Sequence, residues 1–184
     1  MTLPHRAACV LLLCLMAHSR PALAQATDST PPAPRPADVA SIDSIMTAIY
    51  AAISGPVGQP RQWDRFLSLV HPQARLIPAR CPPTGPCTVR ILSPQEYRQR
   101  ADSSLVALGF VERELVRRTE RYGSMAQAFS SYASYRRGET EPFARGINSF
   151  QLFWDGQRWW IMTIFWDSER PNNPLPAEMQ GSQH

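Results

Sequence analysis

The sequence predicts an α+β fold in which three N-terminal helices pack on a curved, mainly antiparallel sheet. Apolar residues recur at helical spacing in the first part of the domain, and strand-like segments separated by turns follow Gly109. The order of these segments supplies the topology. An antiparallel sheet needs cover for its apolar face, and three amphipathic helices are available to provide it.

The N-terminus has the pattern of a secretory signal peptide over residues 1–24. Arg6 precedes an apolar run over residues 7–17, and a small-residue site follows at residues 22–24. A run of eleven apolar residues is too short to cross a bilayer core of roughly 30 Å. We therefore predict an exported protein, in the periplasm or the extracellular medium, without membrane insertion.

The mature chain divides into a linker, one domain and a tail. Residues 25–37 are rich in proline and poor in apolar residues, which favours an extended linker. The domain is expected over residues 38–168. The polar residues 169–184 are expected to form a flexible tail.

The helix ends have clear local signals. Gly55-Pro56 ends the first helix, Pro60 begins the second, and a capping box from Ser93 to Glu96 opens the third. The helices are expected over residues 38–53, 60–70 and 94–107.

Strand patterns occupy the rest of the domain. Residues 74–93 read as two short strands joined by a turn. Tyr122-Gly123, a polar stretch and Asp155-Gly156 provide the later turns. The four later strands are expected at about residues 110–121, 124–136, 145–154 and 158–167.

The mature chain keeps two cysteines, Cys81 and Cys87, on either side of a Pro- and Gly-rich turn. In an oxidising compartment this spacing favours a disulfide that closes a small loop, worth about 2 kcal/mol. A metal site would need further ligands, and the mature chain has only His71 and His184 as histidines. We therefore expect a disulfide and no metal.

The charge of the mature chain is nearly balanced. All 19 basic residues are arginines, and removal of the signal leaves 17 of them against 15 acidic residues, a net charge of about +2. So small an excess does not indicate a nucleic-acid partner. The densest cluster, residues 112–121, mixes both signs and is expected to be a solvated strand face.

The chain resembles the nuclear transport factor 2-like superfamily, and within it the exported or SnoaL-like bacterial members. The resemblance covers about residues 38–168 and rests on element order, on "HPQARLIP" and on "RGINSFQLFWDGQRWWIMTIFW". It implies that the sheet curves around the helices as a cone, with a pocket at the wide end. It also implies frequent dimerisation through the outer face of the sheet.

Alternation along the last two strands predicts which side chains face the helices. Asn148, Phe150 and Leu152 should point inward. On the last strand the even positions should point inward and the odd positions outward, which requires a three-residue turn with a bulge at Gly156. The inward set of that strand is Trp160, Met162, Ile164 and Trp166.

This register predicts a ligand pocket in the cone. Asn148 is polar on the inner face and needs partners or water. The small side chains Ala126 and Ala128 should leave space beside bulkier neighbours, and an apolar cavity with a few polar groups is typical of a small-molecule site. The alternative is that the polar residues are satisfied core residues. The predicted ligand-binding residues are Ser130, Tyr132, Asn148 and Trp166.

The outer face of the predicted sheet is too apolar to stay wholly in water. A homodimer interface would cover it, and we favour this over coverage by the C-terminal tail. The outward residues are Ile147, Gln151, Phe153, Ile161, Thr163 and Phe165.

The resemblance also raises the possibility of catalysis. Isomerase-like and cyclase-like relatives use a pocket carboxylate as general base, and the isomerase-like pattern places it in the first strand. Residues 74–80, which occupy that strand here, contain no acid. This departure argues against the isomerase mechanism.

Other acid-base candidates are weak. His71 is expected to cap a helix or lie at the surface, Asp64 to be solvated, and Asp167 to face outward. Glu112 and Glu114 stand among arginines, which should lower the pKa of both carboxyls and make them poor proton shuttles.

The sequence alone does not decide whether the protein is an enzyme, and it favours a binding function. The leading hypothesis is an exported, homodimeric domain without a cofactor that binds a small, partly apolar molecule in its cone. The alternatives are a proton-transfer enzyme of the isomerase or cyclase type and a protein-interaction module.

Overall fold

The computed structural model describes residues 30–181. The predicted signal peptide, the first five residues of the linker and residues 182–184 lie outside this range. The helices are α1 (Pro36–Val39), α2 (Ile42–Ile53), α3 (Trp63–Leu69), α4 (Pro94–Leu108) and the short 3-10 helix η1 (Ala177–Met179). The strands are β1 (Val70–Arg80), β2 (Thr88–Val89), β3 (Val111–Tyr122), β4 (Met125–Tyr135), β5 (Ala144–Trp154) and β6 (Trp159–Ser168).

Capping side chains set the ends of the helices. The first predicted helix is divided into α1 and α2, because the Ser41 side chain caps α2 by accepting a hydrogen bond from the Ser44 amide. The predicted capping box of α4 is present, with reciprocal bonds between Ser93 and Glu96. The helix ends at Gly109, whose φ of 58° carries no Cβ penalty in glycine.

The six strands form one sheet in the order β2-β1-β6-β5-β4-β3. β3 to β6 make the predicted antiparallel meander. β1 pairs antiparallel with β2 and parallel with β6, where Val70 lies opposite Ile161. The parallel pairing, which the sequence analysis did not predict, joins the N-terminal half of the domain to its last strand.

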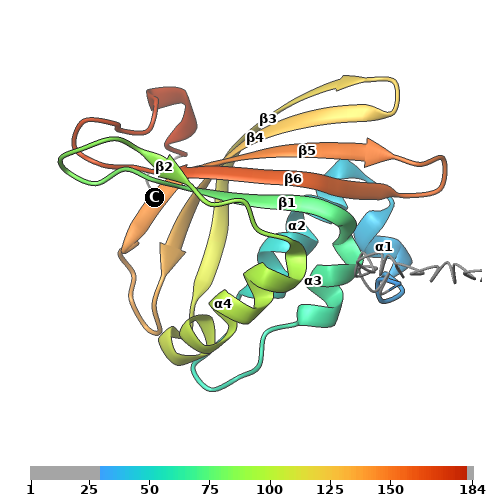
Figure 1. The fold of residues 1–184 in the computed structure, drawn as a ribbon, viewed down its shortest axis with the longest axis horizontal. Helices are drawn as coiled ribbons and strands as arrows, with labels where there is room; N and C mark the ends of the chain where they lie inside the picture. The colour runs from blue at the N-terminus through green and yellow to red at the C-terminus, as the bar shows by residue number, and fades with distance from the viewer. Residues whose placement is uncertain (1–29, 182–184) are drawn as a thin grey trace, which may run out of the picture.

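The helices and the C-terminal segment lie on opposite sides of the sheet. Helices α2, α3 and α4 lie along one face of the curved sheet, and the chain that follows β6 turns back over the other face (Figure 1). The core lies between the helices and the sheet. The predicted α+β architecture is therefore confirmed. The largest fully buried core side chains include Ile45, Met46, Phe66, Leu69, Leu76, Phe150 and Ile161.

The register of the last hairpin differs from the predicted one in its first half. Residues 155–158 connect the strands, so that Trp154 pairs with Trp159, and the register then shifts by one residue on β6 after Ile161. The bulge reverses the alternation of side chains. The prediction is thus correct for Ile164 and Trp166, which line the inner face. It is wrong for Ile161 and Trp159, which are both buried although odd positions were expected to point outward. Trp160, expected to point inward, packs beside His71 and under Arg158 instead.

The C-terminal segment, predicted to be a flexible tail, packs against the outer face of the sheet. Leu175 and Met179 are 5% and 2% exposed. The amide of Leu175 donates a hydrogen bond to Glu169, whose carboxylate also pairs with Arg145 of β5. Part of the apolar outer face is thus covered from within the chain. The rest stays open, and Met125, Phe129, Phe153 and Phe165 are each about 40% exposed or more.

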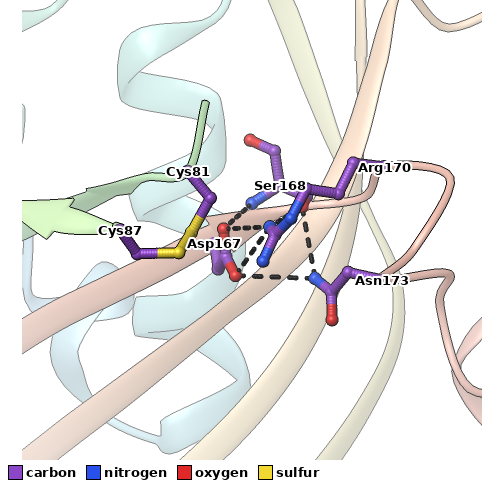
Figure 2. The surroundings of a disulfide bond; sticks show 6 residues. All are labelled: Cys81, Cys87, Asp167, Ser168, Arg170 and Asn173. Carbon is purple, nitrogen blue, oxygen red and sulfur yellow. Dashed lines mark hydrogen bonds and ion pairs between the residues drawn. A yellow bond between two sulfur atoms is a disulfide. The ribbon is translucent and has the colours of Figure 1, made fainter. Parts of the chain in front are cut away.

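Cys81 and Cys87 form the predicted disulfide in the loop between β1 and β2. The bond lies beside the end of β6, where Asp167 binds Arg170 at 2.8 Å and Asn173 bonds the same carboxylate (Figure 2). A disulfide is typical of an oxidising environment. Among the described residues, no helix is both long and apolar enough to cross a membrane.

Candidate functional site

A cavity of about 240 Å³ opens between the helices and the inner face of the sheet. Its apolar wall comes from α2, α3, α4 and the strands. Its polar groups come from β3, β4 and β5 and from tyrosines on α2, α4 and β4. The lining residues that carry polar atoms are Tyr50, Tyr97, Glu112, Tyr132, Ser134 and Asn148, with Trp166 contributing an indole.

Among residues 30–181, Glu112 of β3 is the only carboxylate that lines this cavity. The Ser134 hydroxyl donates a hydrogen bond of 2.9 Å to Glu112 Oε2, and Asn148 Nδ2 lies 3.5 Å from Oε1. Burial raises the pKa of the Glu112 carboxyl to about 7, although these two donors act in the opposite direction. Near neutral pH the carboxyl therefore exists in both protonation states and can accept or release a proton.

A second group of hydrogen bonds links Asn148 to Tyr50, Ser130 and Glu114. Asn148 Nδ2 donates to the Tyr50 hydroxyl at 3.1 Å, and that hydroxyl lies 2.7 Å from Ser130 Oγ. Ser130 donates in turn to Glu114 at 2.6 Å. Burial raises the pKa of Tyr50 well above its ordinary value, so this hydroxyl stays neutral. The network holds the Asn148 amide in place beside Glu112.

Two tyrosine hydroxyls are less firmly held. Tyr97 of α4 stacks on Phe66 with ring centroids 5.5 Å apart, and its hydroxyl hydrogen-bonds no residue that the structure describes. Tyr132 makes a single 3.4 Å contact with the Ser168 hydroxyl. Burial raises the pKa of Tyr132 to about 12 and also raises that of Tyr97. Both therefore remain protonated donors that can bind an acceptor in the cavity.

The position of Tyr132 depends on the absence of a side chain at Gly146. A Cβ added there would lie 2.6 Å from the Tyr132 hydroxyl and 2.3 Å from the Asp167 carbonyl oxygen. Neighbouring β5 thus leaves room for the tyrosine to lie across it. Gly146 stands in the "RGIN" stretch of the sequence, and its role beside Tyr132 was not predicted.

Three of the four predicted ligand-binding residues line the cavity, namely Tyr132, Asn148 and Trp166. Ser130 does not line it, and is fully buried in the network with Tyr50. Ala126 and Ala128 were expected to leave empty space, but both are buried in the packed core and neither lines the cavity.

The sequence-based prediction for Glu112 is wrong. The pKa of the Glu112 carboxyl was expected to fall because arginines flank it in the sequence, and burial raises this pKa instead. Alternation explains the error: neighbours in a strand point to opposite faces, so Arg113 is exposed while Glu112 faces the cavity. Glu114, also expected to have a lowered pKa, bonds Ser130 and lies 3.6 Å from Arg117. Alternation applied to "VERE" could have identified Glu112.

The remaining acid-base candidates lie away from the cavity. Asp64 is exposed, as expected, and Asp167 binds Arg170 at the outer surface. His71 lies on β1 with its ring edge-on to Trp160, 5.6 Å between centroids. Within residues 30–181, no three histidine, cysteine, aspartate or glutamate side chains are grouped as a metal site would require.

Comparisons with known proteins support the fold and no more. No protein-family model and no curated protein matches the chain. A solved protein of unknown function with a cystatin-like fold, from Nostoc punctiforme, aligns with a TM-score of 0.54 at 12% identity, over 73% of this chain and 92% of its own. The yeast UBP3-associated protein BRE5 aligns with a TM-score of 0.50 at 10% identity, over 69% of this chain and 92% of its own.

Nuclear transport factor 2-like proteins are also among the structural neighbours. One of unknown function from Methylobacillus flagellatus aligns at 12% identity with a TM-score of 0.46, over 71% of this chain and 95% of its own. At identities this low the likeness concerns the arrangement of helices and strands. The chemistry of the cavity therefore has to be argued from its own residues.

Proposed function

We propose that the protein binds a small, partly apolar molecule in the cone cavity, with a polar group of that molecule meeting Glu112 and the tyrosine hydroxyls. The observation that carries this proposal is a partly buried carboxylate on the wall of an otherwise apolar cavity of about 240 Å³. A carboxylate in such a position loses hydration free energy, and this loss does nothing to stabilise the core. A ligand group that hydrogen-bonds it recovers part of that loss.

Native mass spectrometry of the mature protein, purified without denaturation, tests this proposal first. A discrete added mass that disappears on mild denaturation would identify the ligand class. Ala144→Leu is the matched variant, because Ala144 lines the cavity and a leucine there fills part of it. Ala107→Leu makes the same change on the exposed side of α4. Loss of the added mass in the first variant alone is expected, and retention in both would contradict the proposal.

Export and family placement belong to the same proposal. The disulfide between Cys81 and Cys87 supports an oxidising compartment. Together with the signal pattern at residues 1–24, it is consistent with an exported, SnoaL-like member of the nuclear transport factor 2-like superfamily. The uncovered part of the outer sheet face is where the homodimer expected from the sequence would form.

A second candidate function is proton transfer, favoured by the presence of Glu112 and two tyrosine donors in one cavity. In such a reaction Glu112 removes a proton from carbon next to a ligand carbonyl. Tyr97 or Tyr132 then donates a hydrogen bond to the enolate oxygen, and Glu112 returns the proton to the conjugated carbon. No acid on β1 is needed, because the base comes from β3.

Isomerisation of a β,γ-unsaturated cyclic ketone, followed by the absorbance of the conjugated product, tests this second function. Activity should be lost in Glu112→Gln and fall in Tyr97→Phe. Glu120→Gln, an exposed change on the same strand, should retain it. Equal rates in the wild type and Glu112→Gln would exclude Glu112 as the base and leave the binding function.

A further inference from the structure

A second cleft lies between the β1–β2 hairpin and helix α4, and it carries three arginines. Arg80 comes from the end of β1, Arg90 from the segment after β2, and Arg100 from α4. The antiparallel pairing places Arg80 opposite Thr88, and the amide of Arg90 bonds the Pro78 carbonyl oxygen. Arg80 and Arg90 therefore share the face of the hairpin that points toward α4.

None of the three guanidinium groups forms an ion pair or a side-chain hydrogen bond with the part of the chain that the structure describes. All three side chains are exposed. Helix α4 carries two acidic residues: Glu96, whose carboxylate is bonded to Ser93 in the capping box, and Asp102, which accepts a hydrogen bond from the Trp63 indole. The cleft is thus a concentration of positive charge that the chain itself does not neutralise.

This arginine cleft adjoins the cavity. Tyr97 and Trp166 line both, and their rings meet edge to face with centroids 6.0 Å apart. The two aromatic side chains form the boundary between an apolar space and a basic one. Glu112 lines the cavity and not the cleft, so the negative charge lies on one side of this boundary and the three positive charges lie on the other.

We propose that the cavity and the arginine cleft together bind one amphipathic organic anion, whose carboxylate, sulfonate or phosphate group lies among Arg80, Arg90 and Arg100 while its apolar part lies against Tyr97 and Trp166 and reaches into the cavity. This inference rests on the proposed binding function and specifies the class of ligand. A guanidinium group binds such oxyanions through two parallel hydrogen bonds, which explains why arginine suits this position.

The disulfide contributes by fixing the hairpin. Cys81 directly follows Arg80, and the bond to Cys87 closes the loop just before Thr88. The loop is therefore held where two of the three arginines leave the hairpin. Reduction of this disulfide would loosen the part of the site that binds the anionic group and would leave the cavity unchanged.

Two probes of nearly equal shape separate the two parts of the site. 2-Naphthoate carries an anionic group, and 2-naphthalenemethanol replaces it with a neutral hydroxyl. Binding of each to the full mature protein is measured by calorimetry and by quenching of tryptophan fluorescence, since Trp166 lies at the boundary. The anion should bind more tightly than the alcohol, and its affinity alone should fall as sodium chloride is raised.

The arginine variants then assign the effect. Arg80→Gln, Arg90→Gln and Arg100→Gln together should weaken naphthoate binding about tenfold, as expected for the loss of three exposed charge pairs, and leave the alcohol within about twofold. Arg98→Gln is the control on α4, because Arg98 does not line the cleft. Single arginine variants and the salt titration of the wild type give the same answer if the triple variant is unstable.

The outcomes separate this inference from the function on which it rests. If both probes bind equally well and the arginine variants affect neither, the anion site is wrong while the cavity remains a binding site. If neither probe binds the wild type and native mass spectrometry shows no added mass, the binding function fails and the inference with it.

Discussion

The two ends of the inner sheet face use similar strand patterns and reach opposite results. At the closed end, Ala126, Leu152 and Ile161 lie side by side on three strands and are at most 3% exposed. At the open end, the corresponding row brings together Ser134 and Ala144 beside Glu112, and the cavity lies over it. Both ends contain small side chains, so small size alone does not create a cavity.

The difference lies in what covers each end. Ile45 and Met46, near the start of α2, are fully buried and do not line the cavity, whereas Ile49, Tyr50 and Ile53 toward its end do. Alanines at the closed end allow close packing. At the open end, buried polar groups and fixed aromatic rings keep the space from collapsing.

Truncation of an isoleucine should have the largest effect on stability, and this effect should depend on whether the residue lies at the closed or the open end of the inner sheet face. Ile161→Ala at the closed end should lower the free energy of unfolding by about 4 kcal/mol, because it creates a new void in a packed core. Ile164→Ala, which only enlarges the existing cavity, should cost about 2 kcal/mol. Urea unfolding measures both. Equal losses would mean that the open end is as tightly packed as the closed one.

Glu112→Gln should abolish a pH dependence that belongs to the open end. The folded-state pKa is raised from 4.5 to about 7, so the stability from the protonated carboxyl is fully present below pH 4.5 and is lost as pH rises through 7. At about 1.4 kcal/mol per pH unit this amounts to about 3 kcal/mol.

The variant should therefore be more stable than the wild type at pH 8 and similar to it at pH 4. The groups that face Glu112 are Tyr50, Tyr97, Tyr132, Ser134 and Asn148. These are tyrosine hydroxyls, a serine hydroxyl and a neutral amide, and none of them changes charge between pH 4 and 8. Glu120→Gln is the control. Parallel stability curves for wild type and Glu112→Gln between pH 4 and 8 would contradict the raised pKa.

Enlarging an alanine tests the same contrast in the opposite direction. Ala126→Leu at the closed end should lower stability by about 2 kcal/mol through overpacking. Ala144→Leu points into existing space and should change it by less than about 1 kcal/mol. Thermal unfolding followed by circular dichroism is sufficient. A larger loss for Ala144→Leu than for Ala126→Leu would place the free space at the wrong end.

The smallest change in stability is expected on the outer face. Phe129 and Phe165 are 41% and 43% exposed, so Phe129→Glu should change the unfolding free energy of a monomer by about 0.5 kcal/mol or less. If a second copy covers this face, the same variant should dissociate the homodimer. Sedimentation analysis across protein concentrations measures this, and an unchanged wild-type monomer at high concentration would argue against dimerisation.

Local signals were sufficient to predict most of the fold. The capping box at Ser93, the four strands of the meander and the disulfide follow from neighbouring residues. The bulge on β6 could not be predicted in this way, because it depends on how Ile161 packs against other elements. The parallel partner of β1 lies about ninety residues away in the chain, beyond any local pattern.

The lining of the cavity was predicted in part for the same reason, and its binding of a ligand stays a prediction. Asn148 and Tyr132 were found because polar residues on an apolar face are visible in a strand pattern. Glu112 was missed because its sequence neighbours are arginines, while its spatial neighbours are Ser134 and Asn148. A pKa depends on the spatial neighbours.

The parallel pairing of β1 with β6 also constrains when the domain can form. Val70 cannot pair until Ile161 has been synthesised, and most of the sheet lies between the two residues in the chain. During synthesis the helices and β1 emerge well before their last partner, and pairings of such long sequence separation form slowly. Until β6 arrives, β1 and β5 each lack one neighbouring strand. The last strand therefore controls both the closure of the cavity and the period in which the chain is prone to aggregation.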